Sequence, residues 1–110
     1  MCTLRIRMGS QAHNQAKIEN YNKMNEIRIQ KGALHSYFAM LEGLEEEIEF
    51  EGEKYKLYVE RGNEQIPRYG ITIYILDDFD IVGILYTFED GVAKHRYLTV
   101  KEMKSLTYQI

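Results

Sequence analysis

The stretch EEEIEFEGEKYKLYV, residues 45–59, decides the fold because it marks the point where the chain changes to β-strand patterning. On either side of Gly52, apolar and charged residues alternate with a period of two, which is typical of a half-buried strand. A glycine between two such runs favours a tight hairpin turn. We therefore predict a β-hairpin here, with further strands on its C-terminal side.

The register of this hairpin depends on where its turn falls. A turn at Gly52-Glu53 sets Phe50 opposite Tyr55, whereas a turn at Glu51-Gly52 sets Phe50 opposite Glu53. Either register places lysines of the second strand opposite glutamates of the first, which stabilises the pairing by a few tenths of a kcal/mol. Because glycine at the first turn position suits a type II′ turn, we predict the first register.

The residues before the hairpin have a helical pattern that can be divided in two ways. TLRIRM (3–8) and EIRIQKG (26–32) are similar to each other, and each leads into a helical pattern, which indicates two strand–glycine–helix units. The competing prediction is a single long helix over about residues 10–44 that tolerates Gly32 at a cost of roughly 1 kcal/mol. Both predictions place Leu34, Phe38 and Leu41 on one apolar face.

The residues after the hairpin predict more strands and a final helix. An irregular segment, residues 61–70, precedes strands over residues 69–76 and 81–88, which a tight turn at residues 77–80 connects. Asp90-Gly91 is the signal of a type I′ hairpin, and Thr99 with Glu102 forms the spacing of a helix capping box. The sequence thus predicts one α+β domain over residues 1–110. It consists of an N-terminal helical region of one or two strand–helix units, an antiparallel β-meander of about five strands and a short C-terminal helix. Residues 1–23 either belong to this fold or form a dispensable extension.

Catalytic and metal-binding patterns do not stand out in the sequence. The single cysteine, Cys2, excludes an internal disulfide and a thiolate-based structural zinc site. The three histidines, His13, His35 and His95, do not have metal-ligand spacing, and the acids at residues 77–80 fit turn chemistry. We expect a protein that is not an enzyme and uses no cofactor or metal. Without a long apolar run or a signal segment, a cytoplasmic location without membrane contact is expected.

Acidic residues and tyrosines are the features that point to a partner. Residues 42–53 hold seven glutamates, of which Lys54 and Lys56 can directly neutralise only two. Strand alternation sends two tyrosines to the side of the sheet opposite the predicted core, where they would anchor a partner unless helices cover that face. The residues predicted to bind a partner are Glu42, Glu45, Glu46, Glu47, Tyr58 and Tyr74.

These residues predict a non-catalytic protein-binding module whose acidic surface occludes a basic site on another macromolecule. In composition alone the chain resembles small inhibitors encoded by phages and other mobile elements, and immunity proteins of toxins. The resemblance implies an inhibitor of the anti-defence or immunity type, and a homodimer stays open.

Two other functions remain open. The first 31 residues carry six basic and two acidic side chains, against eight basic and fifteen acidic in the remainder. A nucleic-acid-binding regulator would use this basic part, with contacts from Arg5, Arg7, Arg28 and Lys31. A ligand-binding or enzymatic domain would use the segment 61–70 as a lid over a site.

Overall fold

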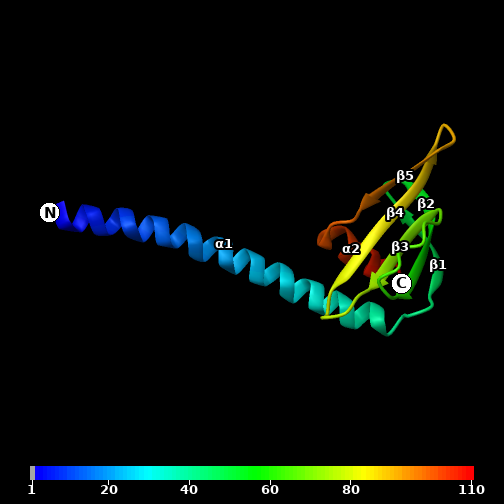
Figure 1. Ribbon diagram of the computed structural model, residues 1–110, viewed down its shortest axis with the longest axis horizontal. Coiled ribbons are helices and arrows are strands. Elements are labelled where there is room, and N and C mark those ends of the chain that lie inside the picture. The colour runs from blue at the N-terminus through cyan, green and yellow to red at the C-terminus, as the bar shows by residue number, and fades with distance from the viewer. Residues whose placement is uncertain (1) are drawn as a thin grey trace.

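In the computed structural model, one long helix leads into a five-stranded sheet that ends in a short helix (Figure 1). The structure describes the backbone of residues 2–110 and the side chains of Asn20 and residues 22–110. The elements are α1 (Cys2–Ala39), β1 (Glu45–Phe50), β2 (Glu53–Arg61), β3 (Gly70–Ile75), β4 (Ile81–Glu89), β5 (Val92–Tyr97), α2 (Val100–Leu106) and the 3₁₀ turn η1 (Thr107–Gln109).

The N-terminal region is one continuous helix, so the prediction of two strand–helix units is wrong. Residues 3–8 and 26–32, the two predicted strands, both lie within α1. A short alternating run becomes a strand only when a neighbouring strand pairs with it, whereas a helix satisfies its backbone hydrogen bonds locally. The alternative prediction of a single long helix is confirmed, although its predicted bounds are not. The helix begins at Cys2 and ends at Ala39, not at residues 10 and 44.

Most of α1 projects away from the rest of the molecule (Figure 1). Among the described side chains of the helix, only Leu34 and Phe38 are buried, with exposed fractions of 6% and 0%. Ile29 and Met24, about one and a half and three turns before Leu34, are 64% and 71% exposed. The radius of gyration is 19.6 Å, against about 13 Å for a compact domain of this length. Among the side chains that the structure describes, the last two turns of α1 therefore supply the buried contacts of the helix.

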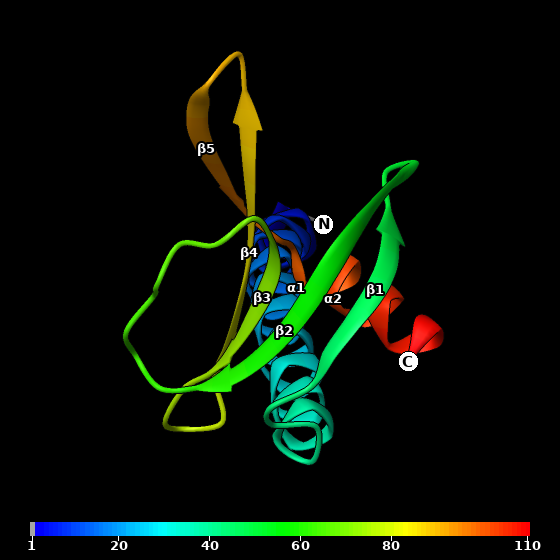
Figure 2. The same ribbon diagram turned by 90° about the vertical axis from the view of Figure 1, so that its right-hand side faces the viewer.

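The five strands lie in the order β1-β2-β3-β4-β5, but they do not form a purely antiparallel meander. β2 and β3 run parallel, with Leu57 opposite Ile71 and Arg61 opposite Ile75, while the other three pairs are antiparallel. The cause is the irregular segment, which carries the chain back along β2 before β3 begins (Figure 2). At its end a Cβ on Gly70 would lie 2.5 Å from the backbone oxygen of Lys56, so only glycine fits at this close approach.

The β1–β2 hairpin has the alternative register that we did not prefer from the sequence. Its turn is Glu51-Gly52, and Phe50 pairs with Glu53, so the predicted pairing of Phe50 with Tyr55 is wrong. Both turn residues have positive φ, 51° at Glu51 and 80° at Gly52, which is the geometry of a type I′ turn. Glycine at the second turn position suits a type I′ turn. Because type I′ and type II′ turns both match the right-handed twist of the strands, that twist does not choose between the two registers.

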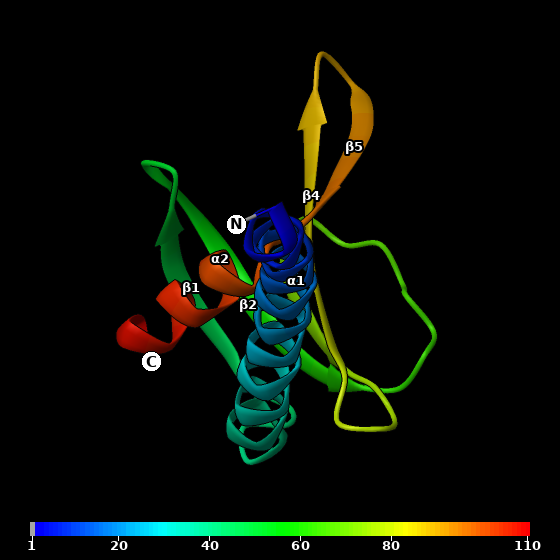
Figure 3. The same ribbon diagram turned by 90° about the vertical axis from the view of Figure 1, so that its left-hand side faces the viewer.

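Both helices lie on one face of the sheet, which we call the helix face; the opposite side is the outer face (Figure 3). The core between them contains Phe38 of α1, Met103 and Leu106 of α2, and the isoleucines Ile71, Ile73 and Ile75 of β3, all buried. Gly83 lies where α2 comes closest to the sheet. A Cβ there would lie 3.0 Å from side-chain atoms of Ile73 and Met103.

The C-terminal hairpin and helix agree with the sequence prediction. Asp90 and Gly91 have φ values of 53° and 78° and connect β4 to β5 with Tyr86 opposite His95. The capping box at the start of α2 is complete, with Thr99 accepting from the Glu102 amide at 3.1 Å and Glu102 accepting from the Thr99 amide at 3.0 Å.

Candidate interaction site

The glutamates predicted to bind a partner lie along one edge of the sheet. β1 is the edge strand next to β2, and Glu45, Glu46 and Glu47 are all exposed on it. Alternation along the strand places Glu45 and Glu47 on the outer face and Glu46 on the helix face. Glu42 precedes the strand, in the turn after α1. The acidic run therefore surrounds this edge and does not form one flat patch.

Cations of the chain itself neutralise part of the run. Lys56 Nζ lies 4.0 Å from Glu45, Lys54 Nζ lies 3.6 Å from Glu47, and Arg61 Nε lies 3.3 Å from Glu42. All of these side chains are half or more exposed, or close to it, so each pair contributes about 0–1 kcal/mol. Within the described residues Glu46 and Glu49 have no ion pair, which leaves the edge with an excess of negative charge.

Tyr58 lies beside the acidic strand, but Tyr74 does not contribute to an open surface. Tyr58 is opposite Glu45 in the β1–β2 pairing and is half-buried, with the guanidinium of Arg68 4.4 Å from its ring centre. Tyr74 is 0% exposed, and its hydroxyl donates a hydrogen bond to the carbonyl of Ile66 at 3.1 Å. The expectation that Tyr74 is displayed on the outer face is therefore wrong, because the segment connecting β2 to β3 lies against it.

This segment is held to the outer face at several points, and its use as a lid over a ligand site stays a prediction. Arg68 forms an ion pair with Glu60 as well as its contact with Tyr58, and the bond from Tyr74 to Ile66 fixes the middle of the segment. Burial raises the pKa of the Tyr74 hydroxyl, as expected for a phenol enclosed between a sheet and a loop. Beside the segment, a groove of 340 Å³ is lined by Glu47, Lys54, Tyr55, Lys56, Tyr58, Arg68 and Tyr69.

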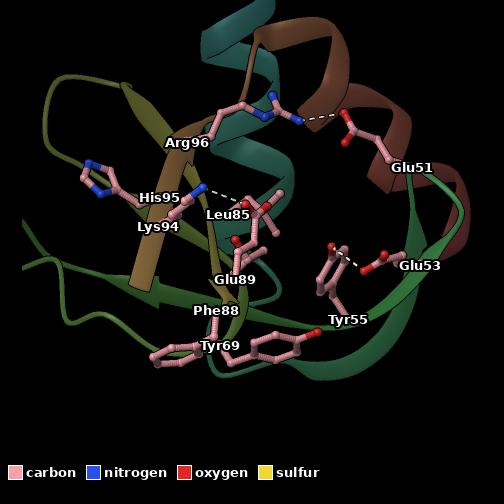
Figure 4. Close-up of a pocket in the computed structure, with 11 residues that line it drawn as sticks. Glu51, Glu53, Tyr55, Tyr69, Leu85, Phe88, Glu89, Lys94, His95 and Arg96 are labelled. Atoms are coloured by element: carbon pink, nitrogen blue, oxygen red, sulfur yellow. Dashed lines mark hydrogen bonds and ion pairs between the residues drawn. The ribbon is translucent and has the colours of Figure 1, made fainter. Parts of the chain in front are cut away.

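The β1–β2 and β4–β5 hairpins diverge beyond the start of β3 (Figure 2). A larger cleft of 480 Å³ is lined by residues of both hairpins (Figure 4). Each charged side chain drawn at its border already has a partner. Arg96 contacts Glu51 at 2.7 Å, Lys94 contacts Glu89 at 2.7 Å, and the Tyr55 hydroxyl donates to Glu53 at 3.0 Å. A ligand in this cleft would have to displace these pairs, which makes the cleft a weaker candidate than the β1 edge.

Arg96 connects three elements around the cleft. In addition to Glu51 in the β1–β2 turn, it donates to both carboxylate oxygens of Glu102 on α2, at 3.0 and 3.1 Å. Its hydrogen bonds lower the pKa of Glu102, and those bonds in turn raise the pKa of Arg96. Burial, followed by the hydrogen bond to Glu53, raises the pKa of Tyr55 to about 12. These shifts indicate a structural network that holds the two hairpins and α2 together.

The residues predicted for nucleic-acid contact are not gathered into one surface by the described structure. The side chains of Arg5 and Arg7 lie outside the described residues, as do those of Cys2 and His13. Arg28 donates to Asn25 at 2.8 Å, and Lys31 lies 3.4 Å from Asp80 in the β3–β4 turn. The nucleic-acid alternative stays a prediction.

Other polar groups have structural roles. Asp80 accepts from its neighbour's amide, Ile81, at 2.8 Å, as expected for turn chemistry, and His35 Nε2 lies 2.9 Å from the carbonyl of Leu76. Among the residues that the structure describes, His, Cys, Asp and Glu form no group able to hold a metal ion. None of the described helical segments combines the length and apolar character that crossing a membrane requires.

No protein-family model, curated protein or solved structure matches this chain. The candidate interaction site is therefore supported only by the contacts and charges of its own residues. Sequence reasoning missed two residues, Arg96 and Gln109. For Arg96 the available signal was the Asp90-Gly91 turn, because a two-residue turn there pairs Arg96 with the apolar Leu85. Gln109, which contacts β1 from 60 residues away, has no local signal.

Proposed function

We propose that this protein is a non-catalytic protein-binding module that uses the β1 edge to occlude a basic surface on another macromolecule. The observation that supports the proposal is the combination, on one edge strand, of four exposed glutamates and only two lysine partners. Complementary potentials would speed the encounter, and Tyr58 beside Glu45 would add an aromatic contact. An inhibitor of the anti-defence or immunity type is the biological role that this composition favours.

Affinity capture with paired baits tests the proposal. The first bait is the parent chain, and the second carries Glu45→Gln, Glu46→Gln and Glu47→Gln. A matched control carries Glu64→Gln, Asp78→Asn and Asp90→Asn, which remove the same charge far from β1; asparagine tolerates the positive φ of 57° and 53° at the two aspartates. A partner recovered by the parent and the control but not by the β1 variant supports the proposal.

Association kinetics then separate charge from fold. If the β1 glutamates steer a basic partner, their replacement should slow association several-fold at low ionic strength and less at high ionic strength, while dissociation changes little. Equal association rates for the parent and the β1 variant at low salt would exclude the acidic edge. Binding of nucleic acid in a gel-shift assay, unaffected by the β1 changes, would favour the basic N-terminal alternative instead.

A further inference from the structure

The backbone of β1 has an open edge that is already partly occupied by a mimic of a strand. The side-chain amide of Gln109 accepts a hydrogen bond from the Glu49 amide at 2.9 Å and donates one to the Glu49 carbonyl at 2.7 Å. These are the bonds that a residue of a neighbouring strand would make. Gln109 therefore satisfies one position of a strand edge that no other strand covers in the described chain.

The same edge remains open toward the start of the strand. In an antiparallel pair, backbone groups point alternately toward and away from the partner strand. Leu44 accepts from Val59 at 3.1 Å, and Glu49 faces Gln109, so residues 44, 46, 48 and 50 face β2. Glu45 and Glu47 must therefore direct their N–H and C=O groups outward, where the described residues offer them no strand.

We propose that this open edge binds an extended, lysine- or arginine-bearing segment of a partner protein by strand addition, with Gln109 as the stop that fixes its register. The inference rests on the proposed function and specifies how the basic partner is held. Main-chain hydrogen bonds to Glu45 and Glu47 would give affinity. Basic side chains of the segment would meet Glu46 on the helix face, which has no ion pair within the described residues. On the outer face they would compete with Lys56 and Lys54 for Glu45 and Glu47. The free stretch before Gln109 accommodates about five residues of an extended chain.

The charge of the β1 edge favours a segment of another protein as its occupant over the β1 edge of a second copy of this chain. Two β1 edges pairing with each other would bring Glu45, Glu46 and Glu47 of both copies together, and like charges across a ladder are destabilising. The opposite edge, β5, is basic, but its Lys94 and Arg96 are engaged with Glu89, Glu51 and Glu102 of their own chain. A basic segment of another protein is the occupant that this edge favours.

The test uses a labelled synthetic peptide of alternating lysine and valine, and the same peptide with N-methyl groups on alternate backbone nitrogens. Fluorescence anisotropy measures binding to the full chain at low salt, and amide hydrogen exchange reports on β1. We expect the first peptide to bind and to slow exchange at Glu45 and Glu47, and the methylated peptide to bind roughly tenfold more weakly or worse.

Variants of the chain separate backbone pairing from charge. Glu47→Pro removes an amide that faces away from β2 and so leaves the hairpin ladder intact, whereas Glu47→Gln removes the same charge and keeps the amide. We expect Glu47→Pro to bind the peptide roughly tenfold more weakly than Glu47→Gln. Gln109→Ala should extend the protected stretch to Glu49.

Three outcomes would overturn the proposal that a basic segment of a partner adds to this edge. If both peptides bind equally, and Glu47→Pro equals Glu47→Gln, charge alone holds the partner; the proposed function then stands without this mode of binding. If the unmethylated peptide does not bind at all, the glutamates only keep the edge from pairing. If the chain forms a dimer in sedimentation experiments and Glu47→Pro abolishes it, the occupant is a second copy.

Discussion

Replacing Arg96 with glutamine should destabilise the protein more than the loss of any other exposed cation among the side chains that the structure describes. Arg96 makes a two-bond contact with Glu102 and one bond with Glu51, and the Glu102 side chain is only 24% exposed. Exposed pairs contribute about 0–1 kcal/mol each, and charge-assisted two-bond contacts lie at the upper end. We therefore expect a loss of about 1–2 kcal/mol in the free energy of unfolding, or a fall in Tm of roughly 4–8 °C.

Lys94→Gln is the matched control, because it removes a cation from the same strand that has one exposed partner, Glu89. Its expected loss is below about 0.5 kcal/mol. Denaturant unfolding at several pH values adds a second readout. The pKa of Glu102 is lowered in the folded protein, so the contribution of its pairing is present above the ordinary value of 4.5 and is lost as the pH falls through the lowered value. The difference in the free energy of unfolding between the parent and Arg96→Gln should thus become smaller in acid. Equal losses of unfolding free energy for Arg96→Gln and Lys94→Gln at neutral pH would refute the stabilising role of the Arg96 network.

Other changes test separate parts of the structure. Because the pKa of Tyr55 rises from 10.0 to about 12, its contribution to stability is complete below pH 10 and is lost as the pH rises toward 12. The free energy of unfolding of Tyr55→Phe, measured with denaturant, should therefore fall less steeply at alkaline pH than that of the parent. An equally steep fall in both proteins would count against the raised pKa of Tyr55. Deleting residues 1–23 should leave Tm unchanged, because the first buried side chain described in α1 is Leu34; a fall of several degrees in thermal melting would contradict this. Gly83→Ala should lose about 1 kcal/mol in the free energy of unfolding through crowding against the side-chain ends of Ile73 and Met103, measured by denaturant unfolding; a variant as stable as the parent would mean that these side chains move aside. Changing Glu45, Glu46 and Glu47 together to glutamine should leave Tm within about 2 °C of the parent; a larger fall in a melting curve would show that folding itself uses the acidic run.

The sequence was sufficient to predict those parts of the structure that depend on a few adjacent residues. Asp90 and Gly91 carry the positive φ values of their turn, and Thr99 with Glu102 completes a cap within one helical turn, so each pattern specifies its own geometry. The α+β class followed from the change of period at residue 45. The prediction of the β1–β2 register failed because two turns gave equally good charge pairs, and Gly52 suits both the first position of a type II′ turn and the second position of a type I′ turn.

Long-range contacts account for the remaining differences. The parallel pairing of β2 with β3 depends on the path of the irregular segment, and composition does not encode that path. The same path buries Tyr74, which strand alternation alone had placed on an open surface. At the candidate site, the glutamates and Tyr58 could be predicted from their spacing. The contact of Gln109 with Glu49 could not, because it joins residues 60 positions apart.

The parallel seam between β2 and β3 also divides the sheet for folding. Each of the other strand pairs is a hairpin whose strands are joined by a short turn, and hairpins form within about 1–10 μs. Only the β2–β3 pairing requires the chain to reverse through the segment 62–69. The conformational entropy lost in closing this loop precedes any stabilisation from the β2–β3 hydrogen bonds. The two halves of the sheet should thus form as local units, and their joining should set the refolding rate. Lengthening the segment 62–69 would slow refolding while leaving each hairpin able to form.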